Sequence, residues 1–209
     1  MPRVTRWWDE ADLPRHYCVA PDGCRDLLLI RRPGCAPLWR MTPLDLRASA
    51  GRAEAGTRFD GFRLSPGSEV DIDRLSRALR GVEEPETGAA VLHDHLRPAT
   101  TLDEALAALA DPDCPEVAAA ARGTGLSLRS LQRLVSTGTG QAPLWWMRLA
   151  RVRRAALALS QAAPVEVAAD HGYADQSHLS REMRHFLRAT PGAVRRGEGP
   201  PIHSGHGTY

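Results

Sequence analysis

The spacing of apolar residues changes near residue 100, and this change divides the chain into two parts. In the first part, short apolar runs are separated by turn-forming residues. Leu27–Ile30, for example, is a continuous apolar run between the turns at 21–23 and 33–34. A run of this length between turn residues predicts a buried strand in a small sheet. We therefore expect residues 1–98 to form a β-rich domain.

The end of this first part has a different pattern. The polar, proline-containing stretch 83–87 is expected to be a surface loop. His93 and His95 alternate as residues on one face of a strand would, but a surface loop ahead of the second domain is the preferred interpretation. One apolar stripe predicts a short helix, and it consists of Ile72, Leu75 and Leu79.

From Thr101 onward the apolar spacing is helical. Thr101 and Glu104 have the spacing of a capping box, which predicts the start of a helix that ends near Asp111. The apolar stripe of this helix consists of Leu102, Ala105, Leu106 and Leu109. A second helix is predicted from Glu116 to Gly123, where glycine provides the backbone that ends a helix.

Ser127 is expected to cap a third helix that reaches about Thr137, and Pro143 begins a long fourth helix that reaches about Gln161. Two helices joined by a short turn with glycine are the plan of a helix-turn-helix unit, whose second helix enters the major groove of DNA. We call that second helix the reading helix. Its expected inward residues are Leu128, Leu131, Leu134 and Val135.

The outer face of this reading helix is then polar. Arg129, Gln132 and Arg133 are spaced i, i+3 and i+4, so they lie together within reach of neighbouring base pairs. Arginine can form two hydrogen bonds to guanine and glutamine two to adenine, so these side chains suit base reading. A solvated helix surface is the alternative interpretation.

An internal repeat at an offset of 47 to 48 residues supports the base-reading interpretation. Ala121, Gly125, Leu126, Leu131, Arg133 and Val135 recur in order as Ala168, Gly172, Tyr173, Leu179, Arg181 and Met183. In the second copy Asp175 is the expected cap, and the expected outward residues are Gln176, Ser177, His178 and Arg181. The predicted helix between the copies is about 25 Å long.

Two reading helices on one connector predict that a single chain spans two consecutive major grooves. Adjacent grooves on one face of B-DNA are about 34 Å apart, so a shorter connector implies tilted reading helices or a bent duplex. Because the two copies differ, the expected target is a non-palindromic stretch of roughly 15 to 20 base pairs.

The distribution of charge agrees with a nucleic-acid partner for the second part. Residues 1–110 have a net charge of −2, whereas residues 114–196, with 12 arginines and 5 acidic residues, have a net charge of +7. A basic module favours a polyanion because each neutralised phosphate releases counterions. The sequence has no apolar run of membrane-spanning length and no secretory signal, so we expect a cytoplasmic protein.

Two segments resemble a known family. HGYADQSHLSREMRHFLRATPGAVRR resembles the signature of the AraC/XylS family of transcriptional regulators, and GLSLRSLQRLV resembles the first reading helix of that family. The resemblance implies a seven-helix domain over residues 99–196 that binds double-stranded DNA and controls transcription initiation, with RNA polymerase as a further partner. The base-reading positions it implies are Arg129, Gln132, Arg133, Gln176, Ser177, His178 and Arg181.

The sequence departs from the family pattern in a few places. Met183 replaces the usual aromatic residue, Arg188 stands where glycine is common, and Trp145-Trp146 is unusually bulky. Ahead of this domain, PDGCRDLLL and GFRLSPG are similar to a short β-rich domain found in some regulators. The fold class is therefore α+β, a small β-rich domain followed by an all-α domain, with a tail at 197–209 that is expected to be disordered.

The charged residues and the cysteines of the chain allow other interpretations. Charged residues of the β-rich part (Asp22, Arg25, Asp26 and Arg63) could line a ligand pocket, but surface turns and ion pairs are preferred. The four cysteines, Cys18, Cys24, Cys35 and Cys114, lack C-x-x-C spacing, so reduced thiols are expected rather than a metal or thiol sensor involving His16.

Two rival functions stay open: a DNA-repair or modification enzyme with a nucleophile among Cys18, Cys24 and Cys35, and a protein-interaction module that has lost DNA binding. The sequence has no nucleophile-base set, phosphate-cradling loop or metal motif, so a regulator without catalytic activity or a cofactor is the leading interpretation. The sequence leaves a small-molecule effector and a homodimer open.

Overall fold

The computed structural model describes residues 4–202, which form two compact units. The N-terminal unit contains the chain up to Tyr17, Cys24–Leu44 and Ala50–Thr100. The helical unit contains the chain from Thr101 onward and also two short segments, Cys18–Gly23 and Asp45–Ser49. A β-rich part followed by a helical part is the α+β class that the sequence predicts. That two segments of the first hundred residues belong to the helical unit was not predicted from the sequence.

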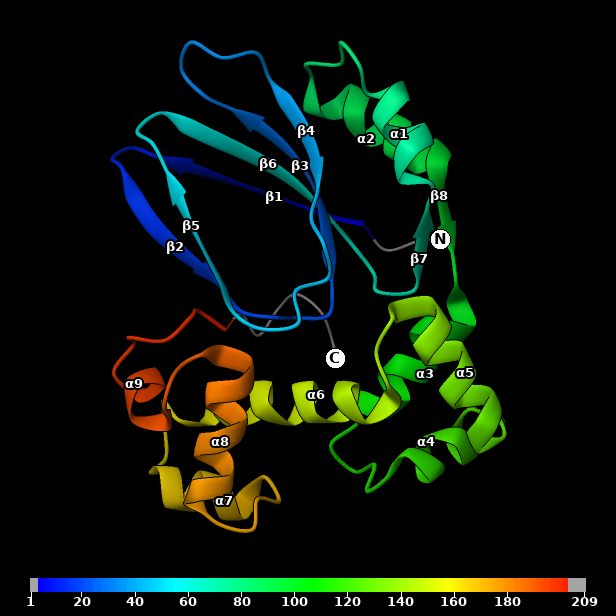
Figure 1. Ribbon diagram of the computed structural model, residues 1–209, viewed down its shortest axis with the longest axis vertical. Coiled ribbons are helices and arrows are strands. Elements are labelled where there is room, and N and C mark those ends of the chain that lie inside the picture. Colours follow the sequence, from blue (N-terminus) through cyan, green and yellow to red (C-terminus); the bar gives the residue numbers. More distant parts are fainter. Residues whose placement is uncertain (1–3, 203–209) are drawn as a thin grey trace. The chain divides into compact units, whose positions relative to one another are not determined.

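The N-terminal unit is built on a four-stranded antiparallel sheet (Figure 1). Its strands, in spatial order, are β1 (Val4–Ala11), β6 (Thr57–Leu64), β3 (Arg25–Arg31) and β4 (Leu38–Met41). Two smaller sheets pair β2 (Arg15–Val19) with β5 (Ser49–Ala53) and β7 (Ser68–Val70) with β8 (Leu96–Pro98). The apolar run Leu27–Ile30 lies in β3, next to the central strand β6, so the predicted buried strand is confirmed.

Two helices, α1 (Ile72–Ala78) and α2 (Pro85–His95), complete the core of this unit. The core consists of Leu27, Phe62, Leu64, Leu75, Leu79, Leu92 and Leu96. The predicted short helix is α1, although Ile72 is 44% exposed rather than buried. The predicted loop at 83–87 is wrong from Pro85 onward, because proline at the first position of a helix loses no hydrogen bond and starts α2. His93 and His95 lie in the last turn of α2, so both the strand and the loop interpretations of these residues are wrong.

Charged residues inside the N-terminal unit are paired with one another. Asp26 accepts hydrogen bonds from Arg63 Nε (3.2 Å) and from Trp7 Nε1 (2.8 Å). Asp60, almost fully buried in β6, accepts from Arg31 Nη1 (2.7 Å) and Arg6 Nη2 (3.4 Å). A buried carboxylate is tolerated when it is paired and hydrogen-bonded. The preferred interpretation of Asp26 and Arg63 as an ion pair is therefore confirmed.

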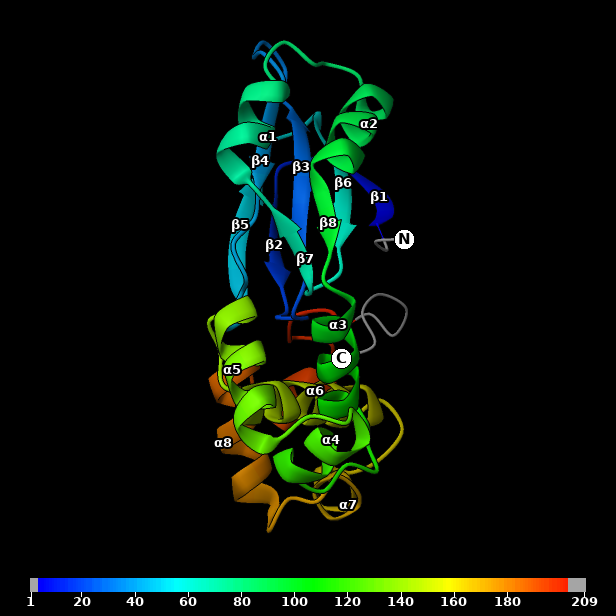
Figure 2. The same cartoon turned by 90° about the vertical axis from the view of Figure 1, so that its right-hand side faces the viewer.

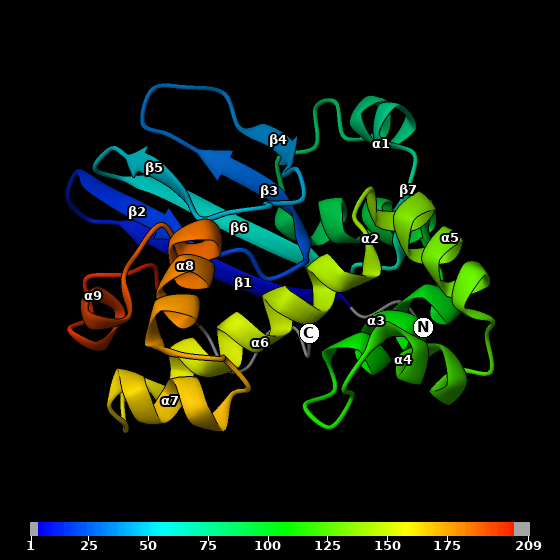
Figure 3. The same ribbon diagram turned by 60° about the horizontal axis from the view of Figure 1, so that its bottom comes forward.

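The helical unit holds seven helices within the described residues (Figure 3). They are α3 (Thr100–Ala110, whose first residue closes the N-terminal unit), α4 (Val117–Gly123), α5 (Leu128–Thr139), α6 (Pro143–Ala158), α7 (Pro164–Asp170), α8 (Gln176–Leu187) and α9 (Pro191–Arg195). The long helix α6 lies between the pair α4 and α5 and the pair α7 and α8. All predicted helix starts in this region are within about two residues of the observed ones. The predicted tail is described only to residue 202, and its remainder, 203–209, lies outside the described residues.

Candidate nucleic-acid interface

The first helix pair is joined by a turn that only glycine adopts easily. Gly125 has a φ of +70°, a left-handed conformation that costs other residues free energy. The next residue, Leu126, donates its backbone N–H to Ala121 O at 2.9 Å and so closes the end of α4. Ser127 then accepts the backbone N–H of Ser130 at 3.1 Å and caps α5, as predicted.

The second pair repeats these features one by one. Gly172 has a φ of +69°, Tyr173 donates its backbone N–H to Ala168 O at 2.9 Å, and Asp175 caps α8 by accepting the N–H of His178 at 2.6 Å. Matching φ values and hydrogen bonds at the predicted offsets confirm that the sequence repeat is a structural repeat.

The second turn is one residue longer than the first, which explains why the offset changes from 47 to 48. The additional residue is Ala174, whose backbone N–H points to Nδ1 of His178 at 3.4 Å. The His178 ring also packs edge-on against Tyr173, with ring centroids 5.2 Å apart. His178 is half-buried, so part of its side chain supports the turn, while contact with DNA stays a prediction.

The residues predicted to read bases lie on the surface of the reading helices α5 and α8. All are exposed except the half-buried His178, and the exposed set consists of Arg129, Gln132, Arg133, Gln176, Ser177 and Arg181. The inward residues Leu131 and Val135 of α5 are fully buried, as are Leu179 and Met183 of α8. Leu128 is 44% exposed, so its predicted inward position is wrong; it lies in the first turn, ahead of the buried stripe.

Both reading helices lie on the same side of the helical unit (Figure 2). In Figure 1 they lie near opposite ends of α6. Two helices in this arrangement can contact the same side of one elongated partner.

The arginines of this surface are available to an external partner. None of its four arginines has an acidic partner within residues 4–202. They are Arg129 and Arg133 on α5, and Arg181 and Arg184 on α8. Arg184 was missed in the sequence analysis, although it follows Arg181 by three positions and is exposed. Its helical spacing from Arg181 was the signal that could have found it.

Comparison with known proteins agrees with this geometry. Residues 120–197 match the model of a family described as a helix-turn-helix domain, and this segment begins in α4 and ends just after α9. Residues 120–197 thus form a helix-turn-helix domain. No curated protein matches the chain.

Three solved structures are similar to the chain at low identity. The C-terminal domain of AraT, a response regulator from Geobacillus stearothermophilus, is 18% identical, covers 51% of this chain and 93% of its own, and has a TM-score of 0.42. Two structures of ToxT from Vibrio cholerae are 7% and 10% identical; each covers 93% of this chain and 97% or 98% of its own, with TM-scores of 0.48 and 0.46.

In the helix-turn-helix domain, the connector α6 and the second reading helix α8 are held together by a buried acid. Glu182 is 4% exposed and accepts from Arg148 Nε at 2.5 Å and from Arg151 Nη2 at 3.1 Å. The Arg151 guanidinium also lies over the ring of Tyr173, 4.6 Å from its centroid. Burial raises the pKa of Tyr173 well above its usual value of 10.0, so the phenol stays protonated.

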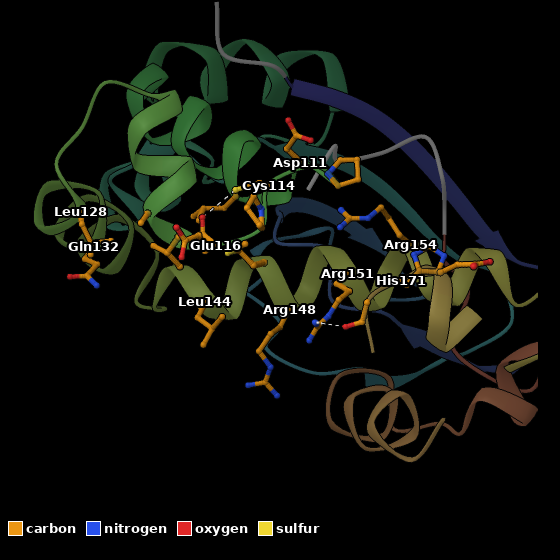
Figure 4. A pocket seen from close by; sticks show the side chains of 18 residues that line it. Asp111, Cys114, Glu116, Leu128, Gln132, Leu144, Arg148, Arg151, Arg154 and His171 are labelled. Carbon is orange, nitrogen blue, oxygen red and sulfur yellow. Dashed lines mark hydrogen bonds between the residues drawn. The ribbon is translucent and has the colours of Figure 1, made fainter. Parts of the chain in front are cut away.

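A groove of about 780 Å³ runs along α6 between the first reading helix and the turn that precedes the second (Figure 4). Among the lining residues labelled in Figure 4, Gln132 and His171 lie at opposite ends. Its charged lining is balanced, because three arginines face three acidic residues: Arg148, Arg151 and Arg154 against Asp111, Glu116 and Asp170. The balance gives the groove no excess of positive charge for an anionic ligand.

The remaining candidate chemistry receives no support from the described residues. None of the four cysteines forms a disulfide in the part of the chain that the structure describes, and burial raises the pKa of the Cys18 thiol despite the charge of nearby Arg188. A nucleophilic cysteine needs the opposite shift, since the thiolate is the reactive form.

Between residues 4 and 202, no three His, Cys, Asp or Glu side chains gather as metal ligands do. Across the same span, every helix is too short or too polar to cross a membrane.

Proposed function

We propose that this protein is a sequence-specific transcriptional regulator that places α5 and α8 in two successive major grooves of one duplex. One observation carries the proposal: the same helix-turn-helix geometry occurs twice on one side of a single connector, and each copy exposes arginines that have no acidic partner among residues 4–202. The match of residues 120–197 to a helix-turn-helix domain supports DNA binding in general. The sequence-specific contacts are the part that is proposed.

The proposed base-reading residues are those that the sequence predicted. In the first groove they are Arg129, Gln132 and Arg133; in the second they are Gln176, Ser177, His178 and Arg181. Arg184 lies one turn further along α8 than Arg181, so it is proposed to contact the phosphate backbone. Base contacts set specificity, whereas phosphate contacts add affinity that does not depend on sequence.

The connector sets the geometry of the proposed complex. A helix of 16 residues is about 24 Å long, which is shorter than the spacing of about 34 Å between successive grooves. The reading helices are therefore tilted in their grooves or the duplex is bent toward the protein. Because the two copies carry different side chains, the target is a non-palindromic stretch of roughly 15 to 20 base pairs.

The N-terminal unit is proposed to sense a small molecule or to form a homodimer, and RNA polymerase is proposed as the partner of the DNA-bound protein. We propose no particular effector chemistry, since two of the charged residues that were candidates for lining a pocket, Asp26 and Arg63, form an ion pair with each other. The proposed place of action is the cytoplasm.

The test selects duplexes from a random pool with the whole chain and then changes the spacing within the selected site. We expect a site with two half-sites, a footprint of roughly 15 to 20 base pairs and a steep loss of affinity with salt. Five inserted base pairs rotate one half-site by about half a turn, so they should reduce affinity to that of a single half-site. A selected site that tolerates this insertion would contradict simultaneous reading. Absence of any DNA binding would favour the protein-interaction alternative.

A further inference from the structure

Two segments that precede residue 50 are built into the helical unit, Cys18–Gly23 and Asp45–Ser49. The match to the helix-turn-helix family begins only at residue 120, so it does not contain them. Within them Ala20, Pro21, Gly23 and Ala48 are buried. Such burial is unusual for loop residues, which usually lie on the surface. Each segment has a specific contact with the connector or with the second reading helix.

The first segment packs against the start of α6 through Gly23. This residue has a φ of +80°, and a Cβ built on it would lie 2.3 Å from Cζ3 of Trp146. Trp146 is 1% exposed, and its ring has little room to move. Gly23 is therefore required both by its backbone conformation and by the close approach of the indole.

The same segment also meets the middle of α6. Arg153 is 6% exposed, and its Nη1 donates to the carbonyl oxygen of Pro21 at 2.9 Å. A buried guanidinium needs such acceptors, because an unsatisfied charged donor is costly away from water. Gly23 and Pro21 thus contact two residues of α6 that are seven positions, or about two turns, apart.

The second segment contacts the end of α8. The backbone N–H of Ala48 donates to Phe186 O at 2.6 Å. The last carbonyls of a helix have no partner within the helix, so Ala48 supplies one from outside. Ala48 is 2% exposed, which places this hydrogen bond in the interior of the helical unit.

We infer that Gly23, Pro21 and Ala48 are positioning residues for DNA binding, which hold α8 against α6 and so fix the separation and tilt of the two reading helices. This inference rests on the proposed function above. The segments are continuous with strands β2 and β5, whose ends they share. The geometry of DNA reading is therefore encoded partly in residues outside the helix-turn-helix sequence.

The test compares Gly23→Ala with Gly34→Ala in the whole chain. Gly34 has a similar φ of +72°, but nothing lies within 4 Å of a Cβ built there, so it controls for backbone strain alone. The measurement is the affinity for the selected duplex divided by the affinity for duplexes with one base pair added or removed between the half-sites. Partial unfolding reduces both affinities by the same factor, so this spacing ratio reports only the geometry of the folded protein.

We expect Gly23→Ala to lower the spacing ratio at least fivefold and Gly34→Ala to leave it unchanged. Arg153→Met, which keeps much of the side-chain volume and removes the bond to Pro21, should lower the ratio as well and serves if Gly23→Ala does not fold. An unchanged ratio in folded Gly23→Ala or Arg153→Met would overturn the inference. If the wild-type protein itself shows no spacing preference, the proposed two-groove function fails instead.

Discussion

Arg151 on α6 donates from Nη2 to Oε2 of Glu182 on α8, across 3.1 Å, and Glu182 is buried whereas Arg151 is partly exposed. Arg148 donates to the other carboxylate oxygen. Glu182 follows Arg181, a proposed base-reading residue, so the same turn of α8 faces the partner on one side and the connector on the other. The position of the second reading helix therefore depends on an ion pair as well as on apolar packing.

Replacing Glu182 by alanine should destabilise the helical unit by about 2 kcal/mol. Removing one partner of a buried pair typically costs about 3 to 5 kcal/mol, but the two arginines keep 28% and 38% of their side-chain surface exposed and can regain water. Urea unfolding would measure this change. Asp113→Ala, at an exposed position of the same unit, is the control and should change stability by less than about 0.5 kcal/mol. Equal effects of the two substitutions would show that the ion pairs of Glu182 contribute nothing to the free energy of unfolding.

Arg188 is the only residue other than glycine with a positive φ among residues 4–202, and its φ is +53°. It ends α8 as Gly140, with a φ of +73°, ends α5. We expect Arg188→Gly to stabilise the protein by about 0.5 to 1 kcal/mol, because glycine adopts this conformation without steric cost. The same substitution at Arg184, inside α8, should cost about 1 kcal/mol. Thermal unfolding of both variants would measure the two changes in stability. If both substitutions raised or both lowered the midpoint of unfolding, the result would contradict this prediction.

Two histidines should make the helical unit less stable in mild acid. Burial and the charge of Arg154 lower the pKa of His171 below its usual 6.5, and burial with the charges of Arg47 and Arg148 lowers the pKa of His185. The unfolded chain then binds protons at a higher pH than the folded chain does, so stability falls as the pH falls through about 6.5.

The midpoint of thermal unfolding should therefore be lower at pH 5.5 than at pH 7.5. In the double variant His171→Gln, His185→Gln, the difference between the two midpoints should shrink. An undiminished difference would assign the pH dependence to carboxylates. Glu86 and Glu198, whose pKa values are lowered by Arg6 and Arg196, are two such groups.

Local features of the sequence predicted the helix pairs well. Ser127 and Asp175 cap their helices as expected, because a cap depends on residues only three positions apart. Glycine at 125 and 172 marked both turns for the same reason. Pro85 was misinterpreted despite being local, because proline is common both in loops and at the first position of a helix.

Features that depend on distant residues could not be predicted. The burial of Glu182 depends on arginines more than 30 positions away on α6. The pairing of Ala48 with Phe186 spans a still longer separation along the chain. Neither contact has a periodic pattern, so hydrophobic spacing contains no signal for it.

Arg133→Ala and Arg181→Ala should each weaken specific DNA binding by about 1 to 3 kcal/mol, roughly 5-fold to 150-fold in affinity, with folding unchanged. The two residues occupy equivalent positions of the two copies, and they contact different grooves in the proposed complex. Their effects should therefore add in the double variant, as expected for separate sites without shared partners.

Each substitution should also relax selectivity only in its own half-site, which selection from the random pool with each variant would detect. Arg184→Ala, the proposed phosphate contact, is the matched control: it should weaken binding to all duplexes alike and reduce the slope of affinity against salt by about 1. A loss of selectivity in both half-sites from Arg133→Ala alone would mean that the two reading helices do not act as independent modules. Unchanged affinity in both alanine variants, with normal folding, would remove these arginines from the interface.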